Sequence, residues 1–123
     1  MTAVPGPWVE VLEYYDSLSR EAPHLVPLRD LAHRIASSGY AAALHPWHSM
    51  KGLCIAQAAA RHEDGPHLRI TPVDGSLEFR YVDTPVREHQ WVRTVPINAG
   101  FNRFVSFLDQ LNWFGGVHRE TDS

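Results

Sequence analysis

Residues 67–82 of the chain read HLRITPVDGSLEFRYV, two alternating stretches that meet at Asp74-Gly75. An Asp-Gly pair between alternating stretches is typical of a two-residue β-turn, because both central positions require positive φ. A turn of this length also fixes the register of the two strands. In that register apolar residues face each other on one side of the hairpin, in the pairs Leu68 with Tyr81, Ile70 with Phe79 and Pro72 with Leu77.

The other side of the predicted hairpin is polar. It pairs Thr71 with Glu78 and Arg69 with Arg80. The sequence therefore predicts an antiparallel sheet with one face in the core and one face in water. Pro72 falls in a non-hydrogen-bonded pair beside the turn, so its nitrogen points away from the 76–82 strand. We expect the 67–73 strand to have a free flank at that end.

Two helices are predicted ahead of the sheet. The first begins at Pro7, a residue suited to the first helical position, and it ends before Pro23. Its apolar residues recur at helical spacing, as Trp8, Val11, Leu12, Tyr15 and Leu18. The second helix is predicted from Pro27 to the stop signal Ser38-Gly39.

Three more strands are predicted around this hairpin. Tyr40–His45 and Leu53–Ala60 are apolar on both faces, and we expect them to be strands joined by the loop 46–52. The Ala-rich segment 55–61 favours strand, with a short helix as the alternative. Glu88–Val95 is predicted to be the last strand, ended by a proline.

The chain is predicted to close with a helix. Asn98 is a good N-cap, Gly115-Gly116 is a stop signal, and we expect residues 117–123 to be frayed. The order is two helices, an antiparallel meander of four to five strands, and one C-terminal helix packed on the sheet. Residues 1–123 are therefore predicted to form a single α+β domain.

Composition narrows the class of protein. The 123 residues are 44% hydrophobic and carry a formal charge of −3, which is ordinary for a globular domain. A net negative charge argues against a nucleic-acid partner, which normally requires a basic surface. The apolar runs are too short to span a membrane, and no signal-peptide pattern is present. The lone cysteine, Cys54, excludes an internal disulfide, and we expect a cytoplasmic protein.

Histidine-bearing loops raise the possibility of a small metal-dependent or hydrolytic enzyme. His45 and His48 lie three residues apart and are candidate zinc ligands, with His62, His67 or Cys54 to complete the set. The segment 62–67 mixes imidazoles and carboxylates, although the same residues are typical of a solvated turn. No phosphate loop, nucleophile elbow or zinc-protease motif is present, so we predict no catalytic residue and no cofactor. The enzyme is the alternative hypothesis.

The polar face of the sheet is the leading candidate site. Arginine and tryptophan dominate the binding energy of protein interfaces. The candidate partner-binding residues are Trp47, Arg69, Glu78, Arg80, Trp91 and Arg93. Small acidic α+β domains without catalytic motifs are typical of bacterial immunity, regulator and chaperone-like proteins. We therefore expect a non-enzymatic module that binds a protein partner, with a homodimer as a further possibility.

Overall fold

The computed structural model describes residues 4, 6–57, 65–83 and 86–113. Within these residues the chain forms three α-helices and one five-stranded antiparallel sheet, which confirms the predicted α+β class. The strands follow the chain in the order β1-β2-β3-β4-β5. The elements are α1 (Gly6–Glu21), α2 (Val26–Ala36), β1 (Leu44–Ser49), β2 (Gly52–Gln57), β3 (His67–Val73), β4 (Ser76–Val82), β5 (Trp91–Pro96) and α3 (Gly100–Gln110).

The β3–β4 hairpin has the predicted turn and register. Asp74 and Gly75 have φ of 43° and 80°, as a turn of this type requires. All of the predicted cross-strand pairs are present, from His67 with Val82 to Val73 with Ser76. Strand β2 pairs with β3 only as far as Ile70, so the flank beside Pro72 is free of β2 as predicted.

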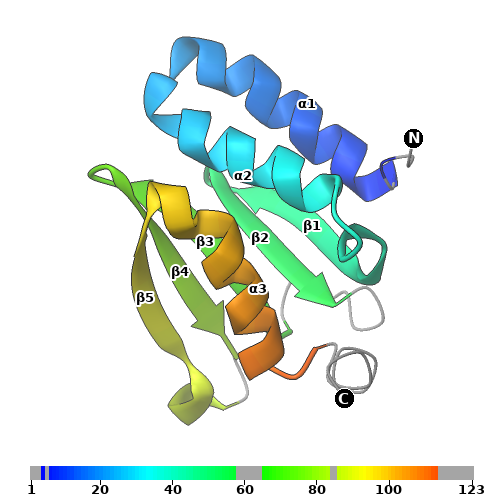
Figure 1. The fold of residues 1–123 in the computed structure, drawn as a ribbon, viewed down its shortest axis with the longest axis vertical. Coiled ribbons are helices and arrows are strands. Elements are labelled where there is room, and N and C mark those ends of the chain that lie inside the picture. The colour runs from blue at the N-terminus through cyan, green and yellow to red at the C-terminus, as the bar shows by residue number, and fades with distance from the viewer. Residues whose placement is uncertain (1–3, 5, 58–64, 84–85, 114–123) are drawn as a thin grey trace.

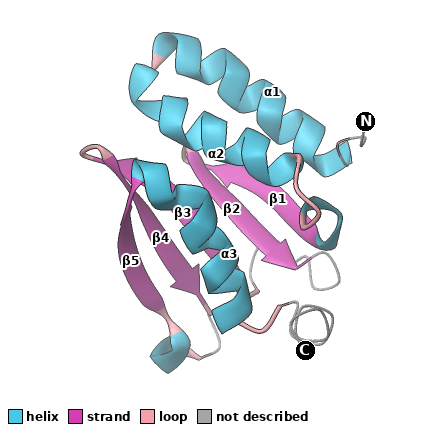
Figure 2. Ribbon diagram, in the orientation of Figure 1, coloured by secondary structure: helices cyan, strands magenta, loops and turns pink. Residues whose placement is uncertain are grey.

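All three helices cover the same face of the sheet (Figures 1 and 2). Helix α1 packs on β1, α2 on β3 and α3 on β5. The side chains between the two layers are almost fully buried; the largest of them include Trp8, Tyr15, Leu28, Ile35, Leu53, Ile55, Leu68, Ile70, Phe79, Phe104 and Phe107. The apolar stripe predicted for the first helix is therefore the stripe that faces the sheet.

Two close contacts fix the helices against the strands. The Tyr15 hydroxyl of α1 donates to the Lys51 carbonyl oxygen at 3.0 Å, which ties this helix to the turn between β1 and β2. At the start of α3, a Cβ on Gly100 would lie 2.9 Å from Leu77 Cδ1. The absence of a side chain there lets α3 approach β4 closely. No helix in the described residues has the length and apolar composition that a membrane span requires.

The first hairpin of the sheet differs from the prediction. Residues 41–43 form a 3-10 turn instead of a strand, and the predicted loop 46–52 is mostly strand. The chain reverses over Met50 and Lys51, which have φ of 48° and 69°. Positive φ at both positions favours glycine or asparagine, so the sequence gives no local signal for this turn.

Two other predicted boundaries are corrected, and a third is only partly covered by the described residues. Residues 55–57 belong to strand β2, as predicted, while residues 58–61 lie outside the described part. The last strand begins at Trp91 and not at Glu88, because residues 87–89 form a 3-10 turn. Asn98 lies in a 3-10 turn and caps nothing, because α3 starts at Gly100 without a side-chain cap. The predicted frayed tail, 117–123, lies outside the described residues.

The buried Tyr15 hydroxyl predicts a loss of stability at alkaline pH. Burial, and then the neighbouring Tyr14, raise the pKa of Tyr15 above the ordinary value of 10.0. Above that pH an unfolded tyrosine releases its proton while the folded one keeps it, so the unfolded state binds fewer protons and stability falls as pH rises. We expect this residue to contribute a loss of about 1.4 kcal/mol per pH unit above that value.

Denaturant unfolding at increasing alkaline pH, followed by tryptophan fluorescence, measures this slope. Tyr15→Phe should make the pH dependence of stability less steep. Part of the dependence should persist, because burial and Asp83 also raise the pKa of Tyr81. Tyr40→Phe is the matched control for removal of a hydroxyl group, because Tyr40 is not among the causes of the raised pKa of Tyr15. An unchanged slope in Tyr15→Phe would contradict the prediction.

Candidate functional site: the uncovered face of the sheet

The sheet face opposite the helices has no helix over it among the described residues. We call it the open face. Strand pairing aligns one residue from each of the five strands in a row across it: Trp47, Cys54, Arg69, Arg80 and Val92. The neighbouring row contains Ser49, Thr71, Glu78 and Thr94. Four of the six predicted partner-binding residues, namely Trp47, Arg69, Glu78 and Arg80, therefore share this face.

Side chains from β1 and β3 meet above β2 on the open face. The rings of Trp47 and His67 lie 5.1 Å apart, although β2 runs between their strands. The β2 residues that face this side are small, and Cys54 and Ala56 are buried. The sequence signal for this arrangement is the alternation of small and large residues along β2, in Gly52-Leu53-Cys54-Ile55-Ala56, which the strand prediction did not use.

Arg69 is held in place by the β1–β2 hairpin. Its Nη2 donates to the Ser49 carbonyl oxygen at 2.8 Å, and its Nη1 lies 3.6 Å from Cys54 Sγ. The guanidinium passes directly over Gly52, where a Cβ would lie 2.9 Å from Arg69 Cζ and 3.0 Å from Thr71 Cγ2. Gly52 thus provides the space that Arg69 needs, a role that sequence reasoning missed.

Arg80 is the more available of the two arginines. It lies directly opposite Arg69, as predicted, but its guanidinium turns along its own strand towards Glu78. The Nη2–Oε1 distance is 3.4 Å, and the Arg80 side chain is 50% exposed. An exposed ion pair of this length contributes little to stability, on the order of 0.2–1 kcal/mol.

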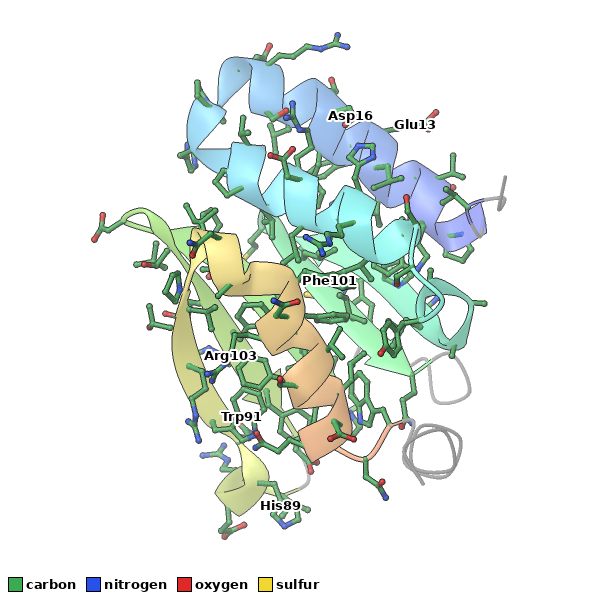
Figure 3. The ribbon with its side chains drawn as sticks, in the orientation of Figure 1. Glu13, Asp16, His89, Trp91, Phe101 and Arg103 are labelled. Atoms are coloured by element: carbon green, nitrogen blue, oxygen red, sulfur yellow. The ribbon has the colours of Figure 1, made fainter. Side chains whose placement is uncertain are left out.

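The structure places Arg93 and Trp91 on the other face. Arg93 lies opposite Phe79 and Trp91 opposite Tyr81, so both face the helix layer. Trp91 packs 4.9 Å from the Phe107 ring of α3, and it lies beside that helix in Figure 3. The Arg93 guanidinium rests 5.3 Å from the Trp91 ring centre. The open face therefore does not include either residue.

Each edge strand of the sheet carries one feature that hinders strand addition. Ser49 and Gly52 flank a two-residue turn and form a hydrogen-bonded pair, so by alternation Pro46 directs its nitrogen away from β2. That ring offers no N–H to an added strand and occupies the space where one would pair. At the other edge, Arg93 Nη1 donates to the Val92 carbonyl oxygen at 2.9 Å.

The histidines that the structure describes do not gather around one point. His45 faces the open side of β1, whereas His48 faces the helix side, where its ring stacks 3.5 Å from the Tyr14 ring. One metal ion cannot take both imidazoles in this arrangement. His67 Nδ1 donates to the Gly65 carbonyl oxygen at 2.8 Å, and His62 lies outside the described residues. Within the described chain no three His, Cys, Asp or Glu side chains are placed to hold a metal ion.

A cavity of about 300 Å³ adjoins the open face at the β1 edge. Trp47 and His45 line it from the strand, and Glu10 and Val11 line it from α1. The surface beside the Trp47 ring is therefore concave. Aromatic residues that contribute strongly to protein binding commonly lie next to such pockets.

No protein family, curated protein or solved structure matches this chain.

The contact between Arg69 and Gly52 can be tested by substitution. In Gly52→Ala the new methyl group should displace the guanidinium and break its bond to Ser49, at a cost of about 1 kcal/mol in unfolding free energy. Gly39→Ala is the control, because a Cβ there has no neighbour within 4 Å among the described atoms.

A double-mutant cycle separates this effect from a general intolerance of alanine. In an Arg69→Ala background, Gly52→Ala should cost less, because only the close contact with Thr71 Cγ2 remains. Equal costs in the two backgrounds, measured by urea unfolding, would show that the arginine does not depend on Gly52.

Proposed function

We propose that this protein is a non-enzymatic module that binds a protein partner on its open face. The observation that carries this proposal is the pair of arginines at opposed positions of β3 and β4, on a sheet face that no described helix covers. Such a face is rigid, because both strands belong to a hairpin with a fixed register. Arg69 is already held by Ser49 and Cys54, so it loses little side-chain freedom when a partner binds, which favours affinity.

The charges of the open face indicate the kind of partner. Its described residues include two guanidinium groups, on Arg69 and Arg80, and one carboxylate, on Glu78. The face is therefore positive although the whole chain carries −3. A protein surface with Asp or Glu side chains complements it. Trp47 supplies the aromatic anchor that interfaces of this kind favour.

Charge reversal at Arg80 should abolish capture of the partner. We expect wild-type protein, immobilised in an extract of the source cells, to retain a protein in stoichiometric amount that Arg80→Glu does not retain. Binding should weaken by at least about tenfold, which corresponds to 1.4 kcal/mol. Mass spectrometry of the bound fraction measures the difference.

Arg93→Glu is the matched control, because it makes the same charge change on the opposite face of the adjacent strand. It should capture the partner as wild type does, and nuclease treatment should not release the partner. Loss of capture in both variants, or release by nuclease, would contradict docking of a protein on the open face.

A further inference from the structure

We infer that Glu78 is a built-in competitor on the open face, which occupies Arg80 until a carboxylate of the partner replaces it. The inference rests on the proposed function and names how the same surface selects its partner. Arg80 already forms an ion pair with Glu78, and this ion pair is weak. The Arg80–Glu78 distance is 3.4 Å, whereas charge-assisted hydrogen bonds of full strength are about 2.7–2.9 Å.

The two residues are badly placed for a stronger bond. They lie two positions apart on β4, so they share a face but project side by side from the same strand. Only one Arg80 nitrogen reaches one Glu78 oxygen within hydrogen-bonding distance. A carboxylate arriving from outside the sheet is free to meet the guanidinium with both oxygens, which is the preferred bidentate geometry.

Arg69 supports the replacement of Glu78 by an external carboxylate, because its own guanidinium is not free to bind Glu78. Its guanidinium is committed to Ser49 and Cys54 at the β1–β2 hairpin, so it does not turn to neutralise Glu78. Its fixed positive charge, on the strand opposite Arg80, still attracts an incoming anion. The site therefore holds a stationary arginine, a movable arginine and one weakly held internal carboxylate.

The exchange makes the open face selective. A single carboxylate displaces Glu78 with little net gain, because one ion pair is lost for each one formed. A partner with several acidic side chains also meets Arg69 and gains a net attraction. Glu78 thus discriminates against isolated acidic groups, by repulsion built into the site.

Hexaglutamate peptide is the probe for this inference. It is titrated at low ionic strength into the full-length protein, and NMR resonances of the Arg80 Nε–H and the Trp47 indole report where it binds. Glu78→Gln should bind the peptide about two- to tenfold more tightly than wild type, because the competitor and its repulsion are both removed. Arg80→Gln should lose the response at Trp47.

Glu88→Gln is the matched control. It removes the same charge from an exposed residue in the 87–89 turn, outside the strands that form the open face, and should bind as wild type does. If Glu78→Gln binds no more tightly than wild type or Glu88→Gln, the competitor role is overturned while an acidic partner stands. If neither wild type nor Glu78→Gln responds at Arg80 or Trp47, acidic complementarity fails too, and with it the proposed docking surface.

Discussion

The tight turn at Asp74-Gly75 is the constraint on which the rest of the structure depends. Two residues with positive φ set the register of β3 and β4, and strand alternation then assigns every side chain of the hairpin to one face. Pairing with β2 and β5 extends that assignment across the sheet. A slip of one residue would place Phe79 in water and Arg80 against the helices, so the core and the candidate site are fixed by the same event.

The β3–β4 hairpin was predictable because its signals lie in adjacent residues. The β1–β2 turn was not predictable, since the contacts that support it come from distant parts of the chain. Met50 and Lys51 adopt positive φ without glycine, which costs roughly 1 kcal/mol or more per residue. The Tyr15 hydroxyl on Lys51 and the Arg69 guanidinium on Ser49 hold this turn from outside it. A reading of adjacent residues cannot find partners that lie 36 and 20 positions away.

The same distinction explains which site residues were placed correctly. Arg69, Glu78 and Arg80 lie in strands joined by a two-residue turn. Their common face therefore follows from the alternation of side chains along each strand, counted from that turn. Arg93 and Trp91 follow a connection of eight residues, 83–90, whose length sets no register. Their face is decided by packing: Trp91 fits against Phe107, and Arg93 covers the Trp91 ring and donates to the Val92 carbonyl oxygen. Alternation alone could not assign them.

Two arginines opposite each other on one sheet face would ordinarily repel, and the way this fold accommodates them decides what the face can do. One guanidinium is turned aside to Ser49 and passes over a glycine, while the other turns to a carboxylate on its own strand. Neither arrangement removes the positive charge from the face. An anion from outside would reduce the remaining repulsion, so the proposed acidic partner would lower the energy of a conflict that the register itself creates.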